Sequence, residues 1–249
     1  MSTISALVAS ATIAGLAAAP APATPTYQVK LRLAPSAVTA TGEPTAATKD
    51  LLGVQGEPKE EQFAYAVLPK NGWSVRIRHK DGEGKFDLTY KHRTPMTGSE
   101  EDALAQAAKE GFGAEETDYE AQVNTSYRSS TLDFSNKKSK DCDPCRIPAE
   151  RDSLKILADK APGKFEKSGA TLEGASMSKT ATQRTWSADG ADLEVTGIGG
   201  GYYVEVTAET DDRSESGTIR QELIQKLDRA SLLMHEDAFK TSHVIEDKL

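Results

Sequence analysis

The segment from Asp192 to Glu209 constrains the fold most, because polar and apolar residues alternate on both sides of a glycine run. Successive side chains of a β-strand point to opposite faces, so each half predicts a strand with one apolar face. Glycines 199–201 supply the backbone freedom that a tight connection needs. The other face is acidic and carries Asp192, Glu194, Thr196, Tyr203, Glu205, Thr207 and Glu209. The segment therefore predicts a hairpin with carboxylates on one face.

Three further segments alternate in the same way but carry cations on their polar faces. They are Tyr27 to Leu33, Trp73 to Lys80 and Lys85 to Arg93, and turn residues at 81–84 join the last two into a predicted hairpin. The cationic faces hold Lys30 and Arg32, then Arg76, Arg78 and Lys80, and finally Lys91 and Arg93.

Weaker signals complete the list of expected elements. Strands are predicted at Phe63–Leu68, Thr117–Asn124 and Tyr127–Phe134, with two more between Thr171 and Ser187. Helices are predicted near Thr48–Leu52, from a Ser99 cap to Gly111, over Pro148–Ala161, and from a cap at Thr218 onward. Residues 135–146 are expected to form a polar loop.

The sorting of charges by strand indicates how the sheet is arranged. Each polar face taken alone is typical of a sheet that shows one side to water. Cationic rows on neighbouring strands repel one another, however, so a sheet gains nothing from them unless an anion lies among them. We therefore predict an α+β fold: a closed antiparallel β-barrel, or tunnel, with a charged interior and helices packed outside its apolar face.

Length and charge narrow the possible functions. The chain has 249 residues, of which 37% are hydrophobic and 27% charged, which is typical of a globular protein large enough to bury a core. Its net charge of −8 argues against binding of a nucleic acid duplex. No segment after the N-terminal leader is long and apolar enough for a membrane span. Residues 24–249 are expected to form a single domain.

The N-terminus and the cysteines indicate the compartment. Residues 1–23 are apolar, uncharged and rich in small residues, which favours a signal peptide and a secreted protein; the alternative is a disordered Ala/Pro leader. Cys142 and Cys145 are expected to form a local disulfide that staples a loop. Two thiols alone make a poor zinc site. His79 and His92 fall on apolar faces and are expected to pack under helices.

These residues together resemble a known family, the triphosphate tunnel metalloenzymes or CYTH group. The segment L-E-V-T-G-I-G-G-G-Y-Y-V-E-V-T is similar to the family's Leu-Asp-x-Val-x-Gly-Leu-Gly-x-Phe-x-Glu-x-Glu motif, with Glu194 and Glu205 on acidic positions. V-R-I-R (75–78) and L-T-Y-K (88–91) are similar to its phosphate-binding strands. Glu120 and Arg184 align with a family glutamate and arginine.

The resemblance implies that the cations and the carboxylates of the tunnel bind different groups. It implies that a phosphate-type ligand is bound by Lys30, Arg32, Arg76, Arg78, Lys91, Arg93 and Arg184. It also implies Mg²⁺ or Mn²⁺ held by Glu194, Glu205 and Glu120, with Glu205 and Glu194 as catalytic residues. The family's first-strand motif, Glu-x-Glu-x-Lys, is reduced here to Thr26, Gln28 and Lys30, and Thr207 replaces a further glutamate. Fewer carboxylates should weaken metal binding.

Three functions follow from these residues. The first is a divergent metal-dependent hydrolase of a phosphoanhydride such as triphosphate. The second is a non-catalytic, extracellular module that binds a small polyanion such as triphosphate or polyphosphate. The third is a structural barrel whose interior charges pair with one another.

Overall fold

The computed structural model describes residues 19–69, 71–237 and 239–249. The strands are β1 Thr26–Leu33, β2 Gln55–Val67, β3 Trp73–Lys80, β4 Lys85–Pro95, β5 Glu120–Thr125, β6 Ser130–Asp141, β7 Ser176–Met177, β8 Ala181–Ala188, β9 Ala191–Ile198 and β10 Gly201–Thr210. The helices are η1 Pro35–Ala37, α1 Ala46–Leu52, α2 Glu100–Lys109, α3 Glu150–Asp159, α4 Gly163–Lys167, α5 Arg213–Arg229 and α6 Lys240–Glu246.

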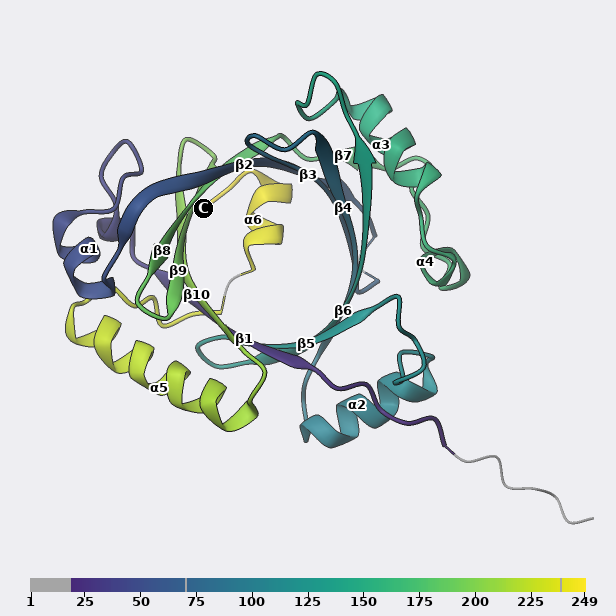
Figure 1. Ribbon diagram of the computed structural model, residues 1–249, viewed down its shortest axis with the longest axis horizontal. Coiled ribbons are helices and arrows are strands. Elements are labelled where there is room, and N and C mark those ends of the chain that lie inside the picture. The colour runs from purple at the N-terminus through teal and green to yellow at the C-terminus, as the bar shows by residue number, and fades with distance from the viewer. Residues whose placement is uncertain (1–18, 70, 238) are drawn as a thin grey trace, which may run out of the picture.

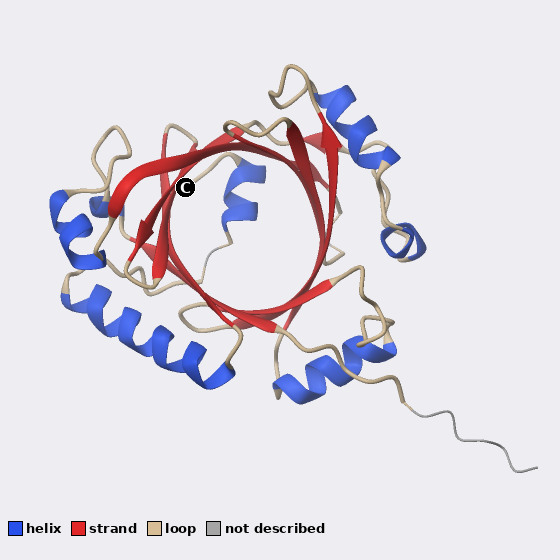
Figure 2. Ribbon diagram, viewed as in Figure 1, coloured by secondary structure: helices blue, strands red, loops and turns tan. Residues whose placement is uncertain are grey.

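The strands close into a barrel. They follow the order β3-β4-β6-β5-β1-β10-β9-β8-β2, and β2 pairs back with β3, so nine strands form a ring while the short β7 adds to β2 (Figure 2). The predicted closed barrel is confirmed. The prediction that it is strictly antiparallel is wrong, because β1 and β5 pair in parallel. Parallel neighbours need a long crossover, and the residues between these two strands, which form β2 to β4 and α2, provide it.

The predicted hairpin, formed by β9 and β10, lies in this ring. Val204 pairs with Val195 and Glu205 with Glu194. Gly199 and Gly200 turn the chain with φ values of 58° and 83°, a left-handed conformation that glycine adopts without strain.

Helices cover the outer, apolar face of the barrel, as predicted. One buried cluster joins β3, β4 and β6 to α2, α3 and α4 through residues such as Tyr90, Leu157 and Phe165. A second joins β1, β9 and β10 to α1 and α5 through residues such as Leu31 and Leu227. Figure 1 shows these helices around the ring. Since burial of apolar area is the main stabilising force, the apolar strand faces are directed outward to meet the helices.

Helix α6 differs from the other helices. In Figure 1 it is the yellow helix drawn within the ring of strands. Its Val244 belongs to a buried cluster with Phe63 and Tyr65 of β2 and Tyr203 of β10, all of which face the interior. The C-terminal helix therefore packs against the inner wall of the barrel.

Two local predictions are corrected. Helix α5 begins at Arg213 and not near Thr218, because Asp212 caps it by accepting a hydrogen bond from the Glu215 backbone N–H at 2.7 Å. Residues 135–141 are strand rather than loop, because β6 continues to pair with β4 as far as Asp141. Polar side chains persist in this stretch because one strand face is turned away from the helices.

Some predictions concern residues at or near the N-terminus. Residues 1–18 of the expected leader lie outside the described part of the chain. Within the described ranges, no helix has the length and apolar character that a membrane span requires.

Candidate functional site

The charged strand faces point into the barrel. The ammonium group of Lys30, on β1, acts electrostatically on Lys91 of β4, Glu194 of β9 and Tyr65 of β2. These strands belong to different parts of the ring, so one side chain can approach all of them only from inside. The predicted cations are therefore brought together within the barrel.

Four of these cations form what we call the basic patch: Lys30, Arg76, Lys91 and Arg93. Two of them share one carboxylate, that of Asp133 on β6. Arg93 donates to Asp133 at 2.8 Å, the Lys91 ammonium lies 3.2 Å from the same carboxylate, and the Asp133 side chain is fully buried. Burial would raise the pKa of Asp133, but Arg93 and Lys91 lower it below its usual value.

The other two cations have no carboxylate partner within the described residues. Arg76 is hydrogen-bonded to the Tyr65 hydroxyl, and its guanidinium lies 5.8 Å from the centre of the Phe63 ring. The Lys30 ammonium makes neither an ion pair nor a hydrogen bond in the described part of the chain. These two cations thus have no ion pair of their own among the described residues, although the Glu194 carboxylate lies within electrostatic range of both.

The cations of the interior shift the pKa values of two neighbouring groups, Lys91 and Tyr65. Burial lowers the pKa of Lys91 to about 8, and the nearby Lys30 and Arg93 add to the effect against the opposing influence of Asp133. Burial would raise the pKa of the Tyr65 phenol, yet Arg76 lowers it below its usual value, assisted by Lys30 and a second ammonium group. Both shifts are those expected beside several cations.

The remaining predicted cations of the interior are already paired. Arg78 lies 2.9 Å from Asp87 and 3.2 Å from Glu61. Arg32 pairs with Glu236, in the segment that leads to α6. These two arginines are therefore less available to a ligand than the basic patch.

The two predicted acidic residues lie side by side, as the hairpin register requires. We call Glu194 and Glu205 the acidic pair. Between them lies the ammonium of Lys240, the first residue of α6, which pairs with Glu194, approaches Glu205 to 2.7 Å and donates to the Gln183 side-chain oxygen at 2.7 Å. The contacts with Glu194 and Gln183 are hydrogen bonds, and the contact with Glu205 is an ion pair.

The electrostatics of the acidic pair follow from this contact. Burial would raise the pKa of Glu194, but the ammonium groups of Lys240 and Lys30 lower it to about 2. Burial would lower the pKa of Lys240, but Glu194 and Glu205 raise it. The Glu194 carboxylate and the Lys240 ammonium therefore remain charged near neutral pH.

This arrangement does not fit the divalent metal that the resemblance implies. Mg²⁺ needs several oxygen ligands in a nearly octahedral site, yet both carboxylates of the acidic pair are bound to Lys240. The third expected ligand, Glu120, lies apart from them, with 67% of its side chain exposed and Lys137 as its ion-pair partner. As folded, the chain has no set of free carboxylates at this position among the described residues.

Arg184 is not brought to the interior. It pairs with Glu43 and lies 5.3 Å from the ring of Trp186, which is buried under α1 and α5 on the outer face. Its neighbour in the strand, Gln183, is the residue that faces inward. The structure thus separates Arg184 from the other predicted phosphate-binding residues.

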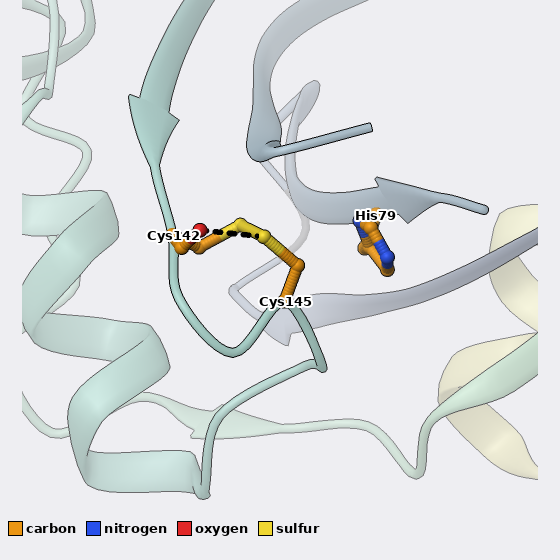
Figure 3. A group of neighbouring side chains, drawn as sticks. All are labelled: His79, Cys142 and Cys145. Carbon is orange, nitrogen blue, oxygen red and sulfur yellow. Dashed lines mark hydrogen bonds between the residues drawn. A yellow bond between two sulfur atoms is a disulfide. The ribbon is translucent and has the colours of Figure 1, made fainter. Parts of the chain in front are cut away.

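The cysteines form the expected disulfide after β6, with their Cα atoms 5.0 Å apart. Figure 3 shows this bridge together with His79 of β3, and the ligand atoms of the three residues lie within 4.8 Å of one another. His79 packs edge-on against Phe86 on the outer face, as expected. Because both sulfur atoms are in the disulfide, they are not thiolate ligands in this state.

Two interior residues are missed by reasoning from sequence alone. Asp133 follows a visible alternation, since Leu132 and Phe134 are apolar, but the acidic residue between them is not assigned to a face. Lys240 gives no such signal, because a short helix in a mixed C-terminal segment does not reveal that it enters a barrel.

Comparisons with known proteins bear on the fold. No protein-family model and no curated protein sequence matches this chain. A candidate adenylyl cyclase from Hippeastrum, described as having a dominant triphosphatase activity, is 16% identical and matches with a TM-score of 0.50 over 89% of this chain and 96% of its own. A candidate adenylate cyclase from Bacillus halodurans is 11% identical, with a TM-score of 0.53 over 90% and 98% of the two chains.

At these identities the likeness concerns the fold alone. The chain has the closed-barrel fold of these candidate cyclases, which is the fold that the resemblance implies.

Proposed function

We propose that this chain, whose fold is that of the triphosphate tunnel proteins, binds a small polyanion of the phosphate type inside its barrel without hydrolysing it. The observation that carries the proposal is the Lys30 ammonium, which points inward, lacks an ion-pair partner in the described residues, and lies near Arg76 and Lys91. A half-buried ammonium without an ion pair can bind an anion through charge-assisted hydrogen bonds.

The chemistry of the basic patch favours a ligand with several phosphate groups. Guanidinium groups bind phosphate oxygens through paired hydrogen bonds, and ammonium groups bind them as point charges. The side chains of Lys91 and Arg93 keep 21% and 24% of their surface exposed although they face the interior, which indicates that solvent reaches them. The described activity of the Hippeastrum protein, triphosphatase, involves a ligand of the same charge type.

Metal-dependent hydrolysis is the second candidate function. It is favoured by the cross-strand contact of Glu194 with Glu205, which places two carboxylates beside the basic patch. If Mg²⁺ or Mn²⁺ were bound, these residues would hold it and the metal would supply an activated water. The bond of both carboxylates to Lys240 argues against this function and is the reason that we rank it second.

Calorimetric titration with tripolyphosphate in metal-free buffer tests the proposal. We expect wild type and Arg184→Ala to bind, and Arg76→Ala to lose about ten- to a hundredfold in affinity, as for loss of one charge-assisted hydrogen bond. Arg184 is the matched control because it is an arginine of the same barrel on the outer face. Absence of binding by wild type, or equal losses in the two variants, contradicts the proposal.

A phosphate-release assay with Mg²⁺ or Mn²⁺ separates the two candidates. Binding without release supports the proposed function. Metal-dependent release that Glu205→Gln abolishes supports the hydrolase.

The compartment is a further proposal. The disulfide supports an oxidising environment, in agreement with the predicted signal peptide. Fractionation of cells expressing the full chain tests whether the protein is exported.

A further inference from the structure

Lys240 has the surroundings that a bound cation would have. Its ammonium is coordinated by oxygen atoms from Glu194, Glu205 and Gln183, which lie on three adjacent strands of the barrel. Its side chain is only 13% exposed. The position is therefore a buried oxygen cage that is occupied by a side chain of the protein itself.

Helix α6 holds this ammonium in place from its far end. Val244 is buried against Phe63 and Tyr203 on the inner wall. Asp247, which follows the helix, accepts a hydrogen bond from the backbone N–H of Gly199 in the β9–β10 turn at 3.1 Å. Because Val244 and Asp247 also attach the helix, loss of the lysine contact alone is not expected to release it.

We propose that Lys240 takes the place of a divalent metal in this barrel, so that the interior receives its ligand as a metal-free polyanion. The polyanionic nature of the ligand rests on the proposed function. The statement that Lys240 occupies the metal position does not depend on it.

The charges around the acidic pair support the presence of the Lys240 ammonium in place of a metal ion. Two carboxylates that face each other repel and need a cation between them. One ammonium compensates half of this charge, and Lys30, which acts on Glu194 from β1, supplies a second positive charge nearby. A divalent ion would have to lose part of its hydration shell and displace an ammonium that already makes two hydrogen bonds and two ion pairs.

The first experiment is a titration of the full chain with Mn²⁺, followed by electron paramagnetic resonance. We expect wild type to show no site that depends on the acidic pair. Lys240→Met keeps the apolar stem but removes the charge, and we expect it to bind Mn²⁺ at least about tenfold more tightly than wild type. Lys240→Met combined with Glu205→Gln should lose this gain.

Lys226→Met is the matched control, because Lys226 is an exposed lysine of α5 on the outside of the barrel. It should behave as wild type. Binding of Mn²⁺ by wild type that Glu205→Gln removes would overturn the inference. A folded Lys240→Met protein without any gain would overturn it as well.

If Lys240→Met does not fold, tripolyphosphate binding by wild type still tests whether the ligand is bound without metal. Tripolyphosphate binding that persists in excess EDTA supports the inference, and binding that requires added Mn²⁺ overturns it. Failure of wild type to bind tripolyphosphate under either condition contradicts the proposed function instead, and the Mn²⁺ titration of wild type with Glu205→Gln then tests Lys240 on its own.

Discussion

The acidic pair and the basic patch lie in the same barrel but differ in how their charges are compensated. The carboxylates of Glu194 and Glu205 are bound by an ammonium group of the protein. The basic patch shares one carboxylate, Asp133, among its members and leaves the Lys30 ammonium without a partner in the described residues. The difference teaches that the protein itself supplies the cation beside its paired carboxylates, whereas it supplies no ion-pair partner for the Lys30 ammonium among the described residues.

The same comparison argues against the third function, a structural barrel whose interior charges all pair with one another. Arg78, Arg32 and Lys240 are paired as that function requires. The half-buried Lys30 has no ion pair among the described residues, so a purely structural network does not account for its ammonium.

The largest expected effect is on stability, at the carboxylate that holds the basic patch together. Asp133→Asn would leave Arg93 and Lys91 without their partner in a buried site, so we expect a loss of about 3–5 kcal/mol in the free energy of unfolding. Urea denaturation measures it. Glu120→Gln is the control, since that exposed ion pair should contribute at most about 1 kcal/mol. Equal midpoints for the two variants would show that burial of the pair is unimportant.

The next effect separates binding from folding at Lys30. Lys30→Met should reduce tripolyphosphate affinity about ten- to a hundredfold, because one charged contact is lost. Its free energy of unfolding should be unchanged or slightly higher, because the ammonium has no ion pair to lose. Calorimetry and urea denaturation of the same preparation measure both. A variant that is destabilised but binds normally would assign Lys30 to the fold.

A smaller effect is expected from pH. The pKa of Lys91 is lowered to about 8, so the residue is charged below that pH and neutral above it. Affinity for tripolyphosphate should therefore be nearly constant up to about pH 7, fall about twofold by about pH 8 and fall about tenfold by about pH 9 as the proton is lost.

The lowered pKa of Lys91 is expected to make the free energy of unfolding rise with pH, whereas the affinity falls. Since the unfolded chain binds the Lys91 proton more tightly, with a pKa near 10.5, this residue should make the fold relatively more stable as pH rises from 8 toward 10.5. Lys91→Gln removes both trends and also corrects for titration of the ligand. A wild-type pH profile identical to that of Lys91→Gln would contradict the assignment.

The smallest effect is expected outside the barrel. Arg184→Ala removes an ion pair with Glu43, whose side chain is 45% exposed, so stability should change by at most about 1 kcal/mol. Tripolyphosphate affinity should not change. A loss of affinity like that of Arg76→Ala would mean that the outer face takes part in binding.

Much of the barrel can be predicted from sequence because strand alternation is local. The acidic pair and the cations of β1, β3 and β4 follow from period-two patterns, and the hairpin register brings Glu194 and Glu205 together. The same rule could have placed Arg184 correctly. It shares a strand face with Trp186, and a face that carries a large apolar residue turns toward the helices.

The features that the sequence does not predict depend on contacts between segments far apart in the chain. Parallel pairing of β1 with β5 is set by closure of the ring, and no pattern within either strand indicates it. Lys240 lies 46 residues from Glu194 in a short helix whose apolar residues, Val244 and Ile245, would fit an outer surface equally well. Its role appears only when the barrel surrounds it.

A crystal structure of the protein with tripolyphosphate and Mn²⁺ tests the central claim most directly. We predict phosphate density beside Lys30, Arg76 and Lys91, with the Lys240 ammonium still bound between Glu194 and Glu205 and no anomalous manganese signal there. Manganese between those two carboxylates, with Lys240 displaced, or a barrel interior without phosphate, would contradict the account.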